Sequence, residues 1–301
     1  MLIATAPPVY REELLKTVFS CPEIGGVRYN TGMVSPHTPE HTLAILKKLA
    51  EEYGKKLWVD LKGRQLRIVS WALPDYGNIV INHDVEVEGP AWVYLRDGEK
   101  LSLKFARGNI LYVDPPPRQA VGQGQSLNII GEHVKIKGYL TENDKAYIDA
   151  AWKLGVGDFM LSFVEGLSDI KDMLREIKSD GFLGLTLKIE SPAGIAFLEQ
   201  TWPKKDSTHR LVLARDDLFT TIGEDKSLIV EYSKKVLAHD PKAILASKLF
   251  SGIERDGSLA LSDITDIEYA KSLGYQNFML SDGICHRHFE KAIAAWKMLS
   301  K

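Results

Sequence analysis

Residues 184–190 read Gly-Leu-Thr-Leu-Lys-Ile-Glu, a short apolar run that ends in two ionisable side chains. A run of this length, bounded by helical stretches, is typical of a buried strand in a parallel sheet. Alternate residues of a strand share a face, so Lys188 and Glu190 point to one side and Ile189 points to the other. The stretch therefore predicts a strand that presents two charges together at its C-terminal end.

The same pattern recurs along the chain and decides the fold class. Eight strand candidates alternate with amphipathic helical stretches. They are Leu2–Thr5, Val27–Asn30, Leu57–Asp60, Asp158–Val164, Gly184–Ile189, Leu211–Ala214, Ala243–Ser247 and Asn277–Ser281. Eight such units predict a closed (β/α)8 barrel, the TIM fold. A doubly wound open sheet is the competing architecture.

Residues 69–137 break this rhythm. The stretch Val85-Glu86-Val87-Glu88 alternates apolar and polar residues, and Arg96-Asp97-Gly98 has the composition of a hairpin turn. Because no helical period appears here, we expect a small β domain over residues 69–137, inserted after the third strand. The barrel would then comprise residues 1–68 and 138–301. Where the rhythm resumes, Thr141 is the predicted N-cap of a helix.

The composition is that of an ordinary globular protein. Of the 301 residues 45% are hydrophobic, and 38 basic against 40 acidic residues leave a net charge of −2. No basic excess indicates nucleic acid, and no apolar run approaches the roughly 20 residues of a membrane-spanning helix. The start lacks the features of a signal peptide, and two cysteines are too few for a disulfide framework, although one bridge stays open. We expect a soluble cytoplasmic protein with neither nucleic acid nor membrane as a partner.

Ionisable or polar residues follow nearly every predicted strand, which is where barrels carry functional groups. They are Arg28, Asn30, Asp60, Lys62, Lys188, Glu190, Arg215, Asp216, Asp217, Ser247, Lys248, Ser281 and Asp282. Two opposite charges at a barrel mouth are costly unless they pair or bind a ligand, so Lys188 and Glu190 form either a structural ion pair or part of a site. Asp216-Asp217 after the next strand is a second acidic element, and repulsion between carboxylates of neighbouring strands would be relieved by Mg²⁺ or Mn²⁺. For Asp216, capping of the following helix is the alternative.

Read in order, these strand ends resemble those of the pyruvate kinase family across nearly the whole barrel. Residues 3–8 resemble that family's first strand and turn, and Arg28-Tyr29-Asn30 its Arg-Leu-Asn. Asp-Leu-Lys-Gly-Arg-Gln-Leu-Arg at 60–67 is similar to its Asp-Thr-Lys-Gly-Pro-Glu-Ile-Arg, which also leads into an insertion. Residues 188–190 match its Lys-Ile-Glu, residues 213–218 its Val-Ala-Arg-Gly-Asp-Leu, residues 244–247 its Ile-Cys-Ala-Thr, and residues 279–281 its Met-Leu-Ser. The order of these matches carries the resemblance.

The resemblance implies a metal-dependent site for phosphoenolpyruvate or another pyruvate-type 2-oxo acid. Glu190 and Asp217 would hold Mg²⁺ or Mn²⁺, and Lys188 would stabilise an enolate or a transferring phosphoryl group. Arg28 would bind phosphate, and Ser247 would place a hydroxyl near the substrate. The other residues implied in substrate binding are Asn30, Arg67, Asp216 and Asp217.

Departures from the family bear on the reaction. Thr31-Gly32 directly follows Asn30, and Leu61 replaces a threonine, which removes ligands of the family's monovalent-cation site and makes a K⁺ requirement doubtful. Asp216 and Phe219 replace glycines beside the substrate carboxylate. The sequence stops after the eighth predicted helix, so the family's C-terminal domain is expected to be absent.

The residues and the resemblance are compatible with three functions. The first is enolate chemistry on a 2-oxo acid, as in a metal-dependent lyase, aldolase or decarboxylase. The second is pyruvate kinase activity proper, with ADP or ATP as a further ligand. The third is ligand binding without catalysis. A homo-oligomer is also left open.

Three further features have a structural and a functional interpretation. His37 and His41 are four residues apart, but the intervening proline favours a loop and a helix start over a metal site. His-Arg-His at 286–288 is either a solvated loop or a phosphate-binding element. Cys285 is either a packed side chain or a reactive thiol, and packing is favoured.

Overall fold

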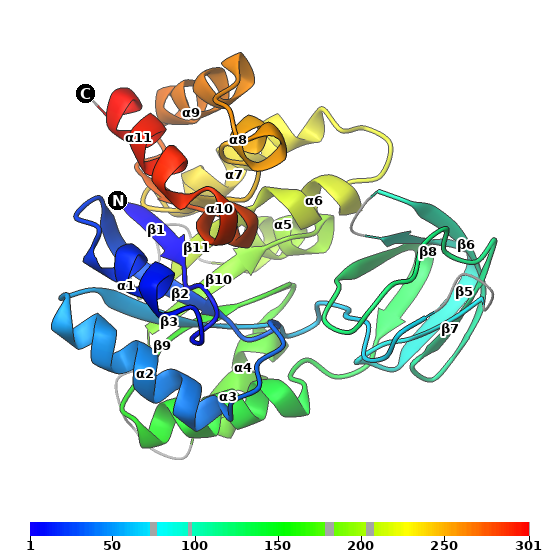
Figure 1. Ribbon diagram of the computed structural model, residues 1–301. Helices are drawn as coiled ribbons and strands as arrows, with labels where there is room; N and C mark the ends of the chain where they lie inside the picture. Colours follow the sequence, from blue (N-terminus) through cyan, green and yellow to red (C-terminus); the bar gives the residue numbers. More distant parts are fainter. Residues whose placement is uncertain (73–76, 96–97, 178–183, 203–207, 301) are drawn as a thin grey trace.

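The computed structural model describes residues 1–72, 77–95, 98–177, 184–202 and 208–300. At its centre is a closed barrel of parallel strands in the order β1-β13-β12-β11-β10-β9-β3-β2, which confirms the TIM barrel and excludes the open sheet (Figure 1). The barrel strands are β1 (Leu2–Thr5), β2 (Ile24–Asn30), β3 (Lys56–Leu61), β9 (Asp158–Leu161), β10 (Gly184–Ile189), β11 (Arg210–Ala214), β12 (Ile244–Ala246) and β13 (Asn277–Met279).

Helices connect the strands and cover the outside of the barrel (Figure 1). They bury apolar faces against the strands, as α2 does with Leu43 and Leu46, both fully buried. The described helices are α1 (Glu12–Ser20), α2 (Pro39–Glu52), α3 (Glu142–Lys153), α4 (Leu167–Glu176), α5 (Pro192–Gln200), α6 (Arg215–Thr221), α7 (Leu228–His239), α8 (Ser251–Asp256), α9 (Leu261–Leu273), α10 (Asp282–Arg287) and α11 (Phe289–Leu299). None of them is long and apolar enough to cross a membrane.

The interior of the barrel changes from apolar to polar along the strands. One layer of buried side chains includes Trp58, Met160 and Val212. Asp60 stands two residues beyond Trp58, and Ser162 two residues beyond Met160. Because a strand places every second residue on the same face, these polar groups also face inward, one layer closer to the C-terminal end. The alternation therefore places buried polar groups directly under the barrel mouth.

The insertion after β3 is an antiparallel sheet in the order β4-β7-β6-β5-β8, which confirms the predicted β-rich insertion. Its strands are β4 (Asn78–Val80), β5 (Val85–Leu95), β6 (Lys100–Arg107), β7 (Ile110–Asp114) and β8 (Leu127–Ile136). They enclose a separate apolar core that includes Val93, Leu101 and Leu111. The sheet stands beside the barrel, on the right in Figure 1. Arg96 and Asp97 of the predicted hairpin turn lie outside the described residues.

Several predicted boundaries shift where the backbone turns sharply. The strand expected to reach Val164 ends at Leu161, because Phe163 takes a left-handed conformation with φ of 50°. The strand expected to reach Ser247 ends at Ala246 for the same reason, since Ser247 has φ of 67°. His286 and Arg287 do not form the solvated loop that was one of the two alternatives for residues 286–288, because α10 extends through Arg287. The predicted N-cap is confirmed: the Thr141 hydroxyl accepts a hydrogen bond from the Asp144 amide.

Candidate active site

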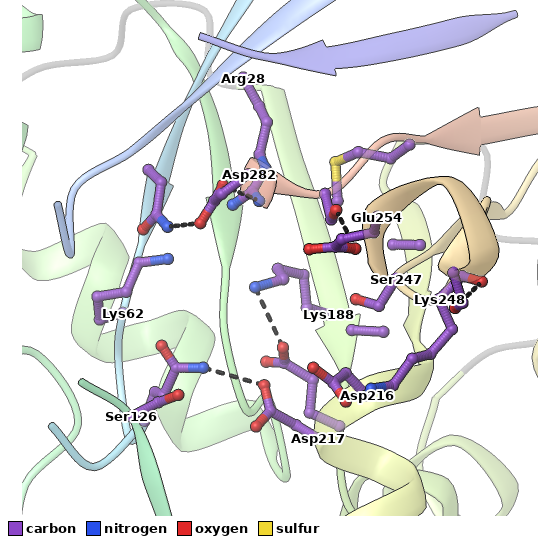
Figure 2. Close-up of a pocket in the computed structure, with 18 of the residues that line it drawn as sticks. Arg28, Lys62, Ser126, Lys188, Asp216, Asp217, Ser247, Lys248, Glu254 and Asp282 are labelled. Carbon is purple, nitrogen blue, oxygen red and sulfur yellow. Dashed lines mark hydrogen bonds and ion pairs between the residues drawn. The ribbon is translucent and has the colours of Figure 1, made fainter. Parts of the chain in front are cut away.

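A cavity of about 700 Å³ lies at the C-terminal end of the barrel. Its walls come from the strand ends, from the helices α6, α8 and α10, and from Ser126 of the inserted segment (Figure 2). The residues that line the cavity include seven cations: Arg28, Lys62, Arg67, Lys188, Lys248, Arg255 and Arg287. Every site residue predicted from the sequence lines it: Arg28, Asn30, Arg67, Lys188, Glu190, Asp216, Asp217 and Ser247.

A buried carboxylate organises the cations on one side of this cavity. Asp60 is fully buried, and its oxygens contact Arg28, Lys62 Nζ at 3.1 Å and Lys188 Nζ at 3.4 Å. Burial disfavours the charged carboxylate, but the three cations outweigh burial and hold the pKa of Asp60 far below its usual value. Burial also lowers the pKa of Lys62 to about 7, against the opposing effect of Asp60. Lys62 is thus the cation of this group that can lose its charge near neutral pH.

Lys188 and Glu190 meet at the end of β10. Lys188 Nζ donates to Ser162 Oγ at 2.9 Å and lies 3.1 Å from Glu190 Oε1. Burial works to lower the pKa of Lys188, but Asp60 and Glu190 raise it above its usual value, so the ammonium stays charged. The structural ion pair weighed from the sequence is therefore present. Because both residues also line the cavity, the pair is available to a ligand.

Glu190 is held in place by the segment that follows β9. Its Oε2 accepts a hydrogen bond of 2.7 Å from the backbone amide of Phe163, the residue in the left-handed conformation. Burial raises the pKa of Glu190, and the negative charge of Asp217 raises it further, while Lys188 opposes both. Two acidic groups therefore stand close enough to repel each other at the end of β10 and the start of α6.

Asp217 is bound by amide groups from the insertion and the segment that leads to it. Its Oδ2 accepts from Gln65 Nε2 at 3.0 Å, and its Oδ1 accepts from Asn128 Nδ2 at 3.2 Å. Gln65 in turn accepts two hydrogen bonds from Arg67, at 3.0 and 2.8 Å. Both groups that orient Asp217 are neutral, so its negative charge remains available to a cation.

The donor set of Glu190 and Asp217 fits a hard divalent cation. Mg²⁺ and Mn²⁺ bind through one or two carboxylates and keep several positions for water and substrate oxygens. Among the described residues, no group of three or more His, Cys, Asp or Glu side chains is placed to hold a metal. The two carboxylates thus fit a site that is completed by water and substrate, and do not fit an all-protein cage.

The loop after β12 brings Ser247 to the cavity in an unusual backbone conformation. Ser247, Lys248 and Phe250 have positive φ values of 67°, 60° and 57°. Such residues cost about 1–3 kcal/mol each and persist where the surroundings hold them. Arg215 does so here, because its NH2 donates to the Ser247 carbonyl at 3.0 Å. The strained loop fixes the position of Ser247 at the cavity wall.

Asp216 does not cap α6, so the helix-capping role that was the alternative for this residue is wrong. No side-chain hydrogen bond caps α6, and Asp216 Oδ1 instead lies 2.7 Å from Lys248 Nζ. Both side chains are about half exposed, so this pair is a rim contact. Asp216 therefore closes the cavity edge between α6 and the strained loop.

Asp282 is a strand-end residue for which the sequence predicts no role. Its Oδ1 accepts from Arg28 NH2 at 2.8 Å, and its Oδ2 accepts from Asn30 Nδ2 at 2.7 Å. Burial opposes the ionisation of Asp282, but Arg28 and His286 outweigh burial and lower its pKa to about 2. The missed signal was its position directly after a barrel strand, the same signal that selected the other site residues. Lys62 was missed in the same way.

The remaining candidates have structural roles. Thr38 caps α2 and Pro39 opens it, so His37 and His41 flank a helix start, as predicted. Cys285 is fully buried, its sulfur accepts from the Thr5 amide at 3.2 Å, and burial raises its pKa to about 12. This confirms packing as its role. Cys21 and Cys285 are both free thiols, so the bridge left open by the sequence does not form.

Comparison with known proteins identifies what the chain resembles. No family model matches the sequence. Over 279 residues the chain is 25% identical to a pyruvate kinase from Thermoplasma acidophilum, with 85% of this chain and 49% of that protein aligned. The chain therefore spans about half the length of this curated relative.

A solved structure shows the same fold. The crystal structure of pyruvate kinase from Pyrobaculum aerophilum matches with a TM-score of 0.74 and 16% identity, covering 100% of this chain and 72% of that one. At this identity the structural match establishes the fold, and the sequence match adds homology to pyruvate kinase. The resemblance drawn from the strand ends is confirmed.

Proposed function

We propose that this pyruvate kinase-like barrel protein is a divalent-metal-dependent enzyme that acts on a 2-oxo acid of the phosphoenolpyruvate and pyruvate type. The observation that carries the proposal is the arrangement of Lys188, Glu190 and Asp217. A buried ammonium stands 3.1 Å from one carboxylate, and a second carboxylate is near enough to raise the pKa of the first. All three groups line one cavity at the end of the barrel where TIM-barrel enzymes carry their sites.

In this proposal Glu190 and Asp217 hold Mg²⁺ or Mn²⁺, and a bound metal would polarise the oxygens of the substrate. Lys188 remains charged and provides positive charge where an enolate or a transferring phosphoryl group develops negative charge. Asp60 and Ser162 keep the Lys188 ammonium in position. The side chain is thereby oriented before the reaction begins, so no reorganisation is needed during it.

The other predicted residues surround this centre. Ser247 supplies a hydroxyl on the far wall, and Figure 2 shows it near Lys188 and Lys248. Asn30, Arg67 and Asp216 contribute to the wall that would contact the substrate. Arg67 is anchored by its hydrogen bonds to Gln65, and Gln65 in turn orients Asp217. Arg67 thus connects the wall that would contact the substrate with the proposed metal ligand.

The proposal is tested by titrating the protein with Mn²⁺ in the presence of pyruvate, oxaloacetate, phosphoenolpyruvate or ADP. We expect metal-dependent binding of a 2-oxo acid, and metal-dependent enolisation or decarboxylation without nucleotide. Glu190→Gln should weaken Mn²⁺ binding by at least about tenfold, because the loss of a ligand costs no less than the loss of a supporting contact. Glu199→Gln, on the outer helix α5 and 44% exposed, is the control. Absence of any metal-dependent binding by the parent protein would refute the proposal.

Pyruvate kinase activity proper is the second candidate, because the relatives with the same barrel are named pyruvate kinases. Production of ATP from phosphoenolpyruvate and ADP would select it. Metal-dependent binding without turnover in either assay would instead indicate a ligand-binding protein.

A further inference from the structure

Asp282 binds two hydrogen-bond donors of the pocket wall, Arg28 and Asn30, which could otherwise bind an anionic ligand. It is the first residue of α10, and its side chain is 22% exposed, facing the cavity. In Figure 2 Asp282 lies next to Arg28 at one end of the pocket, and Asp216 and Asp217 lie at the opposite end, with Lys188 between them. The pocket thus has an acidic group at both ends.

The contacts of Asp282 are those that a bound carboxylate or phosphate would make. One oxygen accepts from the Arg28 guanidinium at 2.8 Å, and the other accepts from the Asn30 amide at 2.7 Å. Both donors come from β2, whereas Asp282 comes from the segment after β13. Charge-assisted hydrogen bonds of this kind are the means by which arginine binds anionic ligands. Asp282 therefore acts as an internal anion for this pair of donors.

Arg28 is engaged on every side. Its Nε donates to Thr5 Oγ1 at 3.0 Å, its NH1 donates to Asp60, and its NH2 donates to Asp282. The Arg28 side chain is only 10% exposed. A phosphoryl group that approached Arg28 would meet two carboxylates already bound to it. Negative charges that share one arginine repel each other strongly where water is largely excluded.

In the proposed function the carboxylates at the other end of the pocket hold the metal, whose charge would offset theirs. Asp217, one of the proposed metal ligands, lies at the end away from Asp282, and Lys188 lies between the two (Figure 2). Glu190, the other proposed ligand, is 3.1 Å from the Lys188 ammonium. A 2-oxo acid needs only that end, because its carboxylate and keto oxygens are adjacent. A phosphoenol acid also needs a separate place for its phosphoryl group.

We propose that Asp282 is a specificity-determining residue, which fills the anion position formed by Arg28 and Asn30 and thereby selects unphosphorylated 2-oxo acids over phosphoenol acids. This inference rests on the proposed function for its substrate class. The occupation of the anion position by Asp282 can be tested without it.

The first experiment measures the binding of inorganic phosphate by calorimetry, without metal and at low salt. Asp282→Ser should bind phosphate at least about tenfold more tightly than the parent, because it frees the donors of Arg28 and Asn30. Asp282→Asn removes the charge but keeps a side chain of the same size, so it provides a second reading if the serine variant fails to fold. The matched control is Asp266→Ser. Asp266 also binds an arginine, Arg215, at 2.6 and 2.8 Å, but it does not line the cavity.

The second experiment compares pyruvate with phosphoenolpyruvate in the presence of Mn²⁺. The parent should bind pyruvate at least as tightly as phosphoenolpyruvate, and the Asp282 variants should shift the ratio toward phosphoenolpyruvate by about tenfold or more. A merely structural role for Asp282 would lower thermal stability without moving this ratio.

Two results would overturn the inference. One is unchanged phosphate affinity in folded Asp282→Ser and Asp282→Asn proteins. The other is a parent protein that prefers phosphoenolpyruvate over pyruvate. A parent that binds no 2-oxo acid with Mn²⁺ would instead contradict the proposed function, whereas a gain in phosphate binding without metal would still support Asp282 as the internal anion.

Discussion

Asn128 of the inserted sheet donates a hydrogen bond of 3.2 Å to Asp217 of the barrel. Asn128 belongs to β8, and Asp217 lies in the first turn of α6, so this bond joins the two parts of the molecule at the proposed metal site. The insertion therefore contributes to the cavity, because one of its side chains orients Asp217, a proposed metal ligand.

Replacing Asn128 with alanine should weaken Mn²⁺ binding by about tenfold, because partners that orient a ligand are typically worth that much in affinity. Titration of Mn²⁺, followed by the electron paramagnetic resonance of the free ion, measures the change. Asn109→Ala serves as the control, since Asn109 is in the same insertion but donates to the carbonyl of Ile81. Equal Mn²⁺ affinities for the parent and the Asn128 variant would show that this hydrogen bond does not contribute to metal binding.

Binding of an anionic substrate should weaken as the pH rises through about 7. Burial lowers the pKa of Lys62 to about 7, so this ammonium is charged below that pH and neutral above it. Since the charged form attracts the substrate, affinity is highest below pH 7 and declines above it. Calorimetric titration with pyruvate and Mn²⁺ between pH 6 and 9 measures the decline. Lys62→Arg, which stays charged across this range, should flatten the profile, and a slope unchanged in that variant would assign the titration to another group.

Asp144→Ala should destabilise the protein by about 3 kcal/mol or more, because it leaves several buried donors without a partner. Asp144 is fully buried, and its carboxylate accepts from the amides of Lys62, Gly63 and Thr141 at 2.8, 3.1 and 3.0 Å. Urea denaturation measures the loss. Asp149→Ala on the same helix, 53% exposed, should change stability by less than about 0.5 kcal/mol. A small effect at Asp144 would mean that water replaces the carboxylate.

Replacing K⁺ with tetramethylammonium should change the binding of Mn²⁺ and pyruvate by less than about twofold. Arg28, Lys62 and Lys188 already contact the Asp60 carboxylate, so its negative charge is compensated without a monovalent cation. Parallel titrations in the two salts at equal ionic strength test this. A marked requirement for K⁺ would show that the three cations do not substitute for it.

The sequence was sufficient for the barrel and for the charged ends of its strands. A strand such as 184–190 has a strict two-residue period, so the inward direction of Lys188 and Glu190 followed from local geometry alone. The order of these strand ends then indicated the resemblance to pyruvate kinase, which the sequence match supports as homology. All of the residues predicted for the site line one cavity, because parallel strands bring their C-terminal ends together.

The contacts that complete the site depend on tertiary packing and could not be predicted in this way. Asp282 pairs with Arg28 only because β13 and β2 both adjoin β1 in the closed barrel. The bond from Asn128 depends on how the insertion is oriented against the barrel. The strained turn at Ser247 follows from its anchoring by Arg215, and a serine has no intrinsic preference for that conformation.

The closure of the barrel also has a consequence for the folding of the chain during its synthesis. The salt bridge between Arg28 and Asp282 joins residues 254 positions apart, and the strands that bring them together close the barrel through β1. During synthesis β2 leaves the ribosome long before its partner exists. A nascent chain that still lacks β13 has two open sheet edges, and its Arg28 has no Asp282 to pair with. The contact between Arg28 and Asp282 is therefore among the last features to form, and an unfinished chain lacks the completed pocket.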